Sequence, residues 1–308
     1  MRKEIKNIAH SVHDRLRQQG RDTHRPFNWM LISYANERFL YRLSKSKYSE
    51  DFVLKGGLIF IGWGIPLRRH TRDIDFHSYT SNELENIIQI IKDVCVEPVE
   101  TDGIVFEPET VKAEIIQEAV DYVGVRAKFQ GRLGERTVIP MQIDISFSDE
   151  ITPLPSMISY PTLLNMPAPQ LLGYPKETVV AEKIHSLVRW GRMTSRKKDF
   201  YDLWYISKQY NFNGDILSEA IQNTFKKRNT EIPDDVPEAL SSEHASNNQA
   251  EWQAFLSEFN SENIDTIDFE IVLRTLRAFL LPPLYAAAKR KQLVSNWNAP
   301  NSAWCQEY

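Results

Sequence analysis

A block of alternating apolar and polar residues between two helical stretches constrains the fold of this chain most strongly. Residues 122–147 form the pattern of two strands joined by a Gly-Arg-Leu-Gly turn, and an earlier strand begins at Ile104. Apolar residues recur every three to four positions before residue 50 and again after residue 176, apart from a polar, acidic segment over 231–250 that we expect to be a mobile loop. The order of these patterns predicts an α+β chain.

Length and composition predict more than one domain. The chain has 308 residues, of which 42% are apolar, and can therefore bury two separate cores. Six prolines without a sustained period lie between residues 149 and 175 and indicate the join. We expect N-terminal helices over 1–50 that brace a core over 51–150, a proline-rich connection over 151–175, and a helical domain over 176–308 that completes the active site.

Charge and cysteine content exclude several classes of protein. Acidic residues (41) outnumber basic ones (37), which gives a net charge of -4. The overall charge of the chain therefore does not attract the phosphate backbone of a nucleic acid. Two cysteines exclude a disulfide framework and a zinc site built on several thiolates. No run approaches the length of about 18 apolar residues that a membrane span needs, and the first residues lack the apolar segment of a secretory signal. We therefore expect a cytoplasmic protein without membrane contact.

The strongest local signal for chemistry is the pair Asp73-x-Asp75. Two carboxylates one residue apart on a strand point the same way and can share a divalent cation. On a later strand, Asp144 alternates with apolar residues and would add a third carboxylate. Three such groups would form a Mg²⁺ site of the kind used in phosphoryl and nucleotidyl transfer. The alternative is that the pair is only the solvated face of an edge strand.

A glycine pair precedes the two acids, between a short predicted strand and a short predicted helix. The backbone N–H groups of Gly56 and Gly57 would approach phosphate oxygens there, at the start of the helix. Basic side chains near this turn are candidates for phosphate contacts, namely Lys55, Arg68, Arg69 and Arg72. The alternative is a plain turn followed by a solubilising loop.

A second basic cluster lies in the helical half. Residues 181–200 contain six Lys or Arg and two acids, in a chain that is acidic overall, which indicates a polyanionic ligand. Lys183 shares a helix face with apolar residues, so we expect its stem to be partly buried. After Arg196, the acids Asp199 and Asp202 share a face of the next helix and would orient Lys183 or a basic neighbour through ion pairs. The alternative is a salt-bridge network that only ties two helices together.

Four short motifs resemble the AbiEii-type nucleotidyltransferase toxins of type IV toxin–antitoxin systems, which include the MenT proteins. In order they are Phe-Val-Leu-Lys-Gly-Gly (52–57), Thr-Arg-Asp-Ile-Asp-Phe (71–76), Val-Ala-Glu-Lys-Ile-His-Ser-Leu (180–187) and Arg-Lys-Lys-Asp-Phe-Tyr-Asp-Leu (196–203). The resemblance implies a DNA-polymerase-β-like nucleotidyltransferase core with a mixed sheet, followed by a C-terminal helical domain.

The resemblance also implies roles. Asp73 and Asp75 would bind Mg²⁺, and Lys183 and Asp199 would line the nucleotide site. The protein would be a toxin that adds nucleotides to an RNA or protein acceptor, tRNA 3′ ends in some members, and a partner encoded beside it would neutralise it.

We therefore expect a Mg²⁺-dependent nucleotidyltransferase, a toxin of a toxin–antitoxin or phage-defence system, that transfers NMP from an NTP to RNA such as a tRNA 3′ end. The expected catalytic residues are Asp73, Asp75, Lys183 and Asp199; the nucleotide-binding residues are Lys55, Gly56, Gly57, Arg69, Arg72, Lys183 and Arg196; and the metal ligands are Asp73, Asp75 and Asp144.

One departure from the family leaves alternatives open. The family usually has Ser or Thr after the glycine pair, whereas this chain has Leu58. A non-catalytic binding scaffold is therefore an alternative. An enzyme that attaches a nucleotide to a protein is another, because it would share the same site.

Overall fold

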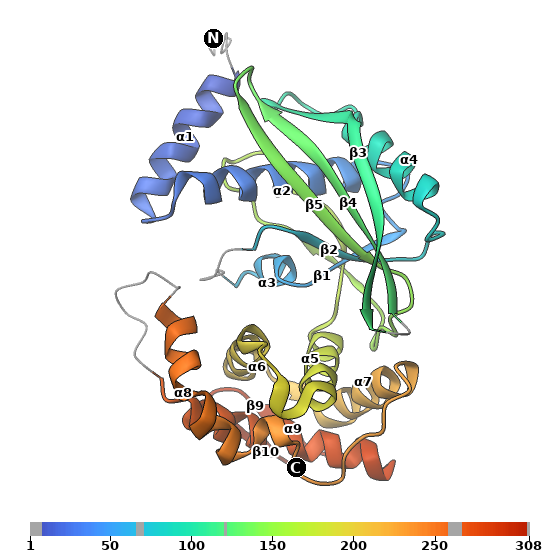
Figure 1. The fold of residues 1–308 in the computed structure, drawn as a ribbon, viewed down its shortest axis with the longest axis vertical. Helices are drawn as coiled ribbons and strands as arrows, with labels where there is room; N and C mark the ends of the chain where they lie inside the picture. The colour runs from blue at the N-terminus through green and yellow to red at the C-terminus, as the bar shows by residue number, and fades with distance from the viewer. Residues whose placement is uncertain (1–7, 66–70, 120–121, 258–266, 307–308) are drawn as a thin grey trace. The chain divides into compact units, whose positions relative to one another are not determined.

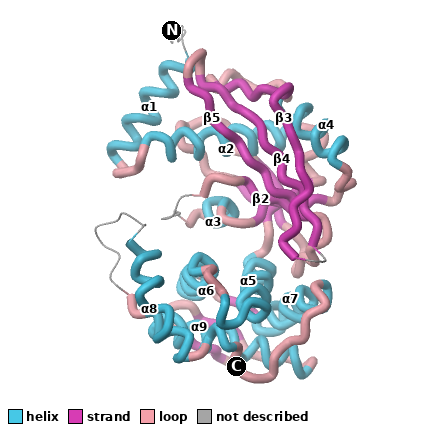
Figure 2. Tube along the Cα trace, viewed as in Figure 1, coloured by secondary structure: helices cyan, strands magenta, loops and turns pink. Residues whose placement is uncertain are grey.

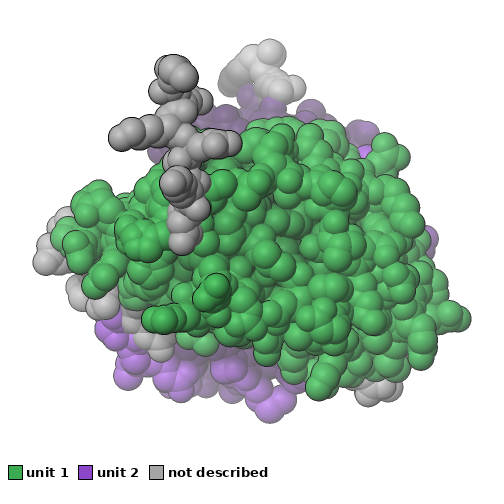
Figure 3. Space-filling view, turned by 90° about the horizontal axis from the view of Figure 1, so that it is seen from above, with its two compact units in different colours: residues 1–148, 155–174 green, residues 149–154, 175–308 purple. Residues whose placement is uncertain are grey.

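The structure of the chain is a computed structural model that describes residues 8–65, 71–119, 122–257 and 267–306 (Figure 1). The chain divides into two compact units (Figure 3). Unit 1 comprises residues 1–148 and 155–174, and unit 2 comprises residues 149–154 and 175–308.

Unit 1 is built on one seven-stranded sheet (Figure 2). Its strands are β1 (Phe52–Lys55), β2 (Ile74–Ser78), β3 (Ile104–Ala119), β4 (Tyr122–Leu133), β5 (Thr137–Ser146), β6 (Ser156–Ser159) and β7 (Gln170–Gly173). Their order across the sheet is β3-β4-β5-β2-β1-β7-β6. The pairs β2/β5 and β1/β7 are parallel and the other pairs are antiparallel, so the sheet is mixed. The hairpin predicted over 122–147 is confirmed as β4 and β5.

Four helices complete the described part of unit 1: α1 (Ile8–Asp22), α2 (Phe27–Lys45), α3 (Leu58–Gly62) and α4 (Leu84–Cys95). Helices α2 and α4 cover one face of the sheet (Figure 1). Phe39 of α2 packs its ring 5.6 Å from that of Phe106 on β3 and 5.2 Å from that of Phe129 on β4. The helices predicted before residue 50 are confirmed as α1 and α2. The core of unit 1 lies between the sheet and the helices α2 and α4.

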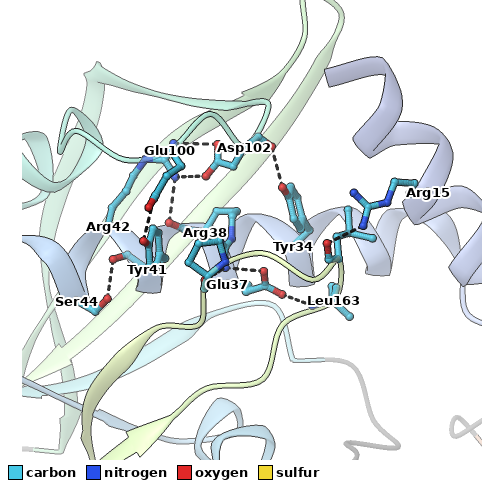
Figure 4. Close-up of polar contacts among 12 residues, drawn as sticks. Arg15, Tyr34, Glu37, Arg38, Tyr41, Arg42, Ser44, Glu100, Asp102 and Leu163 are labelled. Atoms are coloured by element: carbon cyan, nitrogen blue, oxygen red, sulfur yellow. Dashed lines mark hydrogen bonds and ion pairs between the residues drawn. The ribbon is translucent and has the colours of Figure 1, made fainter. Parts of the chain in front are cut away.

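Helix α2 also carries polar side chains into this core and pairs them there (Figure 4). Arg42 donates from Nη1 and Nη2 to the two carboxylate oxygens of Asp102, at 2.7 and 3.1 Å. Glu37 accepts a hydrogen bond from the backbone N–H of Leu163 at 2.6 Å, and Arg38 donates to the carbonyl of Pro167 at 2.9 Å. Because a buried polar group without a partner costs about 1–3 kcal/mol, these bonds hold the segment around Leu163 against α2.

The proline-rich segment contributes to the sheet of unit 1, where a plain connection was expected. It contains β6 and β7, and β7 pairs with β1 in parallel through Val53 and Leu172. Each of these two strands has four residues, which is too short for alternation to separate them from loop. Residues 149–154 belong to unit 2, and the chain returns to unit 2 at Pro175.

Unit 2 is mainly helical. Its helices are α5 (Lys176–Trp190), α6 (Lys197–Gln209), α7 (Gly214–Lys227), α8 (Ser242–Ser257) and α9 (Phe269–Lys289), with short 3₁₀ turns over Gly191–Met193 and Glu238–Leu240. Strands β8 (Phe212–Asn213), β9 (Asn296–Asn298) and β10 (Ala303–Cys305) form a small sheet in the order β10-β9-β8. The prediction of a mobile loop over 231–250 is wrong from Ser242 onward, because α8 begins there. Few of its residues are buried and apolar, so no periodicity marked it.

Helix α9 is the one helix within the described ranges that is long and apolar enough to cross a membrane. Half of that apolar stretch is buried inside the protein. Leu273, Leu276 and Leu280 are fully buried in unit 2. The core helix of a globular unit passes the same test of length and composition, so this helix is weak support for a membrane span.

Candidate functional site

The glycine turn joins β1 to α3, as the sequence predicted. Gly56 has a φ of 65°, in the left-handed region that glycine adopts without strain. A Cβ atom at this position would lie 1.9 Å from Oδ2 of Asp75. The missing side chain of Gly56 therefore leaves the space that the Asp75 carboxylate occupies, and the backbone of the turn lies directly beside that acid.

The residue after the turn points away from solvent. Leu58 begins α3 and is 2% exposed, so its side chain belongs to the core. Helix α3 has only five residues, and Gly57 is its N-cap. Any phosphate contact at this turn would come from backbone N–H groups, because no hydroxyl stands at position 58.

The acid pair lies at the start of β2. Asp73 immediately precedes the strand, Asp75 lies within it, and both are partly exposed. Asn36 of α2 donates from Nδ2 to the carbonyl of Arg72 at 3.0 Å, which fixes the backbone just before Asp73. The Arg72 side chain is exposed. The predicted phosphate ligand Arg69, like Arg68, lies outside the residues that the structure describes.

Backbone register aligns five charged residues across five neighbouring strands. Lys55 of β1 pairs with Asp75 of β2, and Asp75 pairs with Asp144 of β5. Asp144 in turn pairs with Arg126 of β4, and Arg126 pairs with Glu114 of β3. Directly paired residues point to the same face of a sheet. These five residues, the charged row, lie on the face opposite α2 and α4, because Arg126 alternates with the buried residues of β4.

The third predicted carboxylate is held by a guanidinium group. Arg126 donates from Nε to Oδ1 of Asp144 at 2.8 Å and from Nη2 to Oδ2 at 2.7 Å. The hydrogen bond to Asp144 raises the pKa of Arg126, and the charges of Asp73 and Glu114 add to this shift. Neighbouring carboxylates repel each other unless a cation compensates them. Arg126 supplies that compensation for Asp144.

The donor set at β2 fits a divalent cation held by two carboxylates. Across the described ranges, no group of three or more His, Cys, Asp or Glu side chains is arranged to hold a metal ion. Mg²⁺ commonly binds one or two carboxylates together with substrate phosphates and water. Asp73 and Asp75 supply such oxygens, and the Asp75 carboxylate occupies the space that a Cβ of residue 56 would fill.

In unit 2, Lys183 of α5 lies between two carboxylates of α6. Its Nζ donates to Oδ1 of Asp199 at 2.6 Å and lies 3.0 Å from Oδ2 of Asp202. The Asp202 side chain is 4% exposed and that of Asp199 is 13% exposed. The predicted ion pairs are therefore present, and Asp202 contacts the ammonium group from the more buried side.

The neighbouring basic residues differ in their surroundings. Arg196 precedes α6 and is exposed. Lys197 is buried, and its Nζ donates to Oδ1 of Asn248 at 2.7 Å and pairs with Glu251 at 3.0 Å. Lys197 therefore serves the packing of α6 on α8, whereas Arg196 is accessible to solvent.

Sequence reasoning missed two side chains that shape the acid site. Arg126 stands opposite Asp144 in the β4–β5 hairpin, and counting register outward from the hairpin turn would have paired them. Asn36 lies in the middle of α2, and no local pattern marks its hydrogen bond to Arg72.

A family profile matches most of the chain. The profile is described as nucleotidyl transferase AbiEii toxin of type IV toxin–antitoxin systems, and it matches residues 38–279. The chain belongs to this family. It is thus a nucleotidyltransferase of the AbiEii toxin family, and membership of a toxin–antitoxin system implies a cognate antitoxin.

Comparison with individual proteins says less about the family assignment than the family profile does. No curated protein sequence matches the chain. Among solved structures, the chain is similar to MenT4, nucleotidyltransferase toxin Rv2826c from Mycobacterium tuberculosis H37Rv. The two sequences are 14% identical, and the match covers 85% of this chain and 94% of that chain with a TM-score of 0.46. The assignment of this AbiEii chain therefore rests on the family profile.

Proposed function

We propose that this AbiEii toxin is a Mg²⁺-dependent enzyme that transfers NMP from an NTP to RNA, with a tRNA 3′ end as acceptor. The observation that supports this most strongly is the acid pair Asp73 and Asp75, with the Gly56 turn packed against the second carboxylate, in a chain of a nucleotidyltransferase family. The protein would act in the cytoplasm, in a toxin–antitoxin or phage-defence system, with its antitoxin encoded nearby.

In unit 1, Asp73 and Asp75 would hold Mg²⁺, which when bound neutralises phosphate charge and lowers the barrier to attack. Backbone N–H groups of Gly56 and Gly57 would donate to phosphate oxygens. The side chains of Lys55 and Arg72 would add positive charge. The oxygen of the acceptor hydroxyl bonds to the α-phosphorus, and the hydroxyl proton is released to water. The bond between the α-phosphorus and the oxygen that bridges it to the β-phosphate breaks, and pyrophosphate leaves with the bonding pair.

In unit 2, Lys183 and Asp199 would contact the nucleotide. An ammonium group already held by two carboxylates is oriented before the substrate arrives, so little reorganisation is needed when charge develops on the phosphate. Arg196 is exposed beside α6 and would add a phosphate contact. Asp202 would position Lys183 and make no contact with the nucleotide.

The direct test is labelling of total RNA by purified protein with each of the four α-labelled NTPs and Mg²⁺. Asp73→Ala should lose labelling by at least about 100-fold, the usual size of the effect when one preorganised catalytic group is removed. The matched control is Asp93→Ala on α4, which removes a carboxylate that hydrogen-bonds Tyr48 and should leave labelling unchanged. Equal labelling by Asp73→Ala and the unmodified protein would contradict the proposal.

The acceptor needs its own experiment. Sequencing the 3′ ends of cellular RNA after a pulse of expression should show added nucleotides on tRNA. Label in the protein fraction, together with unaltered 3′ ends of the RNA, would show that the acceptor is a protein and not RNA.

One observation favours a second candidate, a binding scaffold without catalysis. The buried Leu58 occupies the position where the family usually carries a hydroxyl. Calorimetric titration with each NTP, with and without Mg²⁺, separates the two candidates. An enzyme binds an NTP in a metal-dependent way, whereas a scaffold shows no such binding.

A further inference from the structure

Asp144 stands beside Asp75 in the sheet, yet its carboxylate is committed to another partner. Asp75 and Asp144 are direct partners on the parallel strands β2 and β5. Both carboxylate oxygens of Asp144 accept hydrogen bonds from Arg126, and Nε2 of Gln142 lies 3.4 and 3.5 Å from them. A carboxylate placed next to the acid pair thus has each oxygen directed at a donor.

We propose that Arg126 is a positioning residue that withholds the third carboxylate from the divalent cation, so that Asp73 and Asp75 bind it without Asp144. This inference rests on the proposed metal dependence but not on the identity of the acceptor. It assigns to Arg126 the control of metal affinity at this site.

The geometry of the pair supports this role. Two parallel N–H···O bonds between a guanidinium and a carboxylate are among the strongest charge-assisted contacts in proteins. The Arg126 and Asp144 side chains are 33% and 20% exposed, so water screens the pair less than it screens a surface ion pair. To bind a cation through either oxygen without sharing that oxygen with Arg126, Asp144 would have to give up the bond that this oxygen accepts, and with it the bidentate contact.

The neighbours of Arg126 in the charged row carry the opposite charge. Its register partner on β3 is Glu114, whose carboxylate forms an ion pair with Lys128 at 2.8 Å. Acids therefore flank Arg126 on both neighbouring strands. The row alternates in charge except at one step, between Asp75 and Asp144, where two acids are adjacent and Arg126 compensates the second.

A consequence concerns the order of binding. Two carboxylates leave most positions of an octahedral Mg²⁺ to water and phosphate oxygens. The cation should therefore bind weakly to the free protein and more tightly together with the triphosphate. A site with three carboxylates would hold the metal before the nucleotide arrives.

The experiment measures Mn²⁺ binding to the full chain without nucleotide, by the electron paramagnetic resonance signal of free Mn²⁺. Five proteins are compared: the unmodified chain, Asp144→Asn, Arg126→Met, the double variant, and Asp73→Asn, which removes a proposed ligand. We expect Asp144→Asn to bind within about twofold of the unmodified chain, because a withheld carboxylate is not a ligand. Arg126→Met should bind about tenfold more tightly, the lower end of the effect of outer-shell partners on metal affinity. The double variant should return to the unmodified affinity.

Lys128→Met is the matched control for charge alone. Lys128 lies two residues from Arg126 on the same face of β4, and it is paired with Glu114 instead of Asp144. Removing its positive charge should change the Mn²⁺ affinity by less than about twofold, because exposed charges are screened by water. If Arg126→Met does not fold, Arg126→Lys is used instead. This variant keeps the positive charge but loses the bidentate contact with Asp144, so it should still bind Mn²⁺ more tightly than the unmodified chain.

Three results would overturn the inference. The first is a loss of affinity in Asp144→Asn as large as that in Asp73→Asn, which would make Asp144 a ligand already. The second is a Mn²⁺ affinity that does not change when Arg126 is replaced. Absence of Mn²⁺ binding in every protein counts as this result. The third is an equal gain in Lys128→Met. No turnover is measured, so a chain that meets these expectations but fails to label RNA would contradict the proposed function alone.

Discussion

The Cα of Gly56 faces the side chain of Asp75 so closely that a Cβ at position 56 would lie 1.9 Å from Oδ2 and 2.7 Å from the Cβ of the aspartate. Real Cβ atoms do not approach other heavy atoms at such distances. Any side chain at position 56 must therefore displace the carboxylate that we propose as a metal ligand.

Gly56→Ala should lose labelling of RNA by at least about 100-fold, because it displaces Asp75. The φ of 65° adds a loss of about 1–2 kcal/mol in the free energy of unfolding. Gly64→Ala is the control: its φ is 79°, but no atom lies within 4 Å of the new Cβ. It should lose similar stability and keep its activity. Labelling assays and urea unfolding of both variants test this, and inactivity of Gly64→Ala would show that strain accounts for the effect.

The Lys183 cluster allows its structural and functional roles to be separated. Lys183→Met removes the ammonium that Asp199 and Asp202 both contact, so the free energy of unfolding should fall by about 3 kcal/mol. Adding Asp202→Asn removes the more buried negative charge and should restore most of this loss. Labelling should stay absent in both variants if Lys183 contacts the nucleotide. Recovery of labelling together with stability would make Lys183 a structural residue only.

The parts of the fold that the sequence predicted are those with local patterns. The alternation in β4 and β5 is visible because side chains on a strand have a period of two and the hairpin partners are adjacent in sequence. Strands β6 and β7 escaped because each has four residues and β7 pairs with β1, more than one hundred residues earlier. Their identity as strands depends on a non-local pairing.

The same limit applies to the candidate site. The glycine pair and the two acids of β2 are recognisable within a few residues of sequence. The contact between Gly56 and Asp75 depends on the antiparallel register that pairs Lys55 with Asp75. The bonds from Arg126 to Asp144 depend on a second register, between β4 and β5. Residue types thus indicated the chemistry, whereas register determined which carboxylates are available for it.

Burial should determine the effect of breaking ion pairs in unit 1. The carboxylate of Asp102 is 3% exposed and accepts two bonds from Arg42, so Asp102→Asn should lower the free energy of unfolding by about 3–5 kcal/mol. The pair of Glu114 and Lys128 is more than half exposed, and Glu114→Gln should change stability by less than about 1 kcal/mol. Chemical unfolding of both variants measures the difference. Equal effects would contradict the role of the buried contact in Figure 4.

The buried carboxyl of Glu37 should make stability depend on pH. Burial raises the pKa of Glu37 from 4.5 to about 7, although Arg38 and the N–H of Leu163 oppose this shift. The folded chain therefore keeps a proton on Glu37 at pH values where the unfolded chain has released it. Stability from this group is fully present below about pH 4.5 and is lost as the pH rises through about 7.

Glu37→Gln removes the titration and keeps an oxygen that can accept the hydrogen bond from Leu163. Relative to this variant, the unmodified chain should lose on the order of 2–3 kcal/mol of unfolding free energy between about pH 5 and pH 8, because the carboxyl must ionise inside the core. Urea unfolding of both proteins at one-unit intervals of pH measures the difference, which cancels the titration of all other groups. A constant difference would mean that Glu37 is ionised throughout and that the Arg38 guanidinium, 2.8 Å from Oε1, outweighs the burial of the carboxylate.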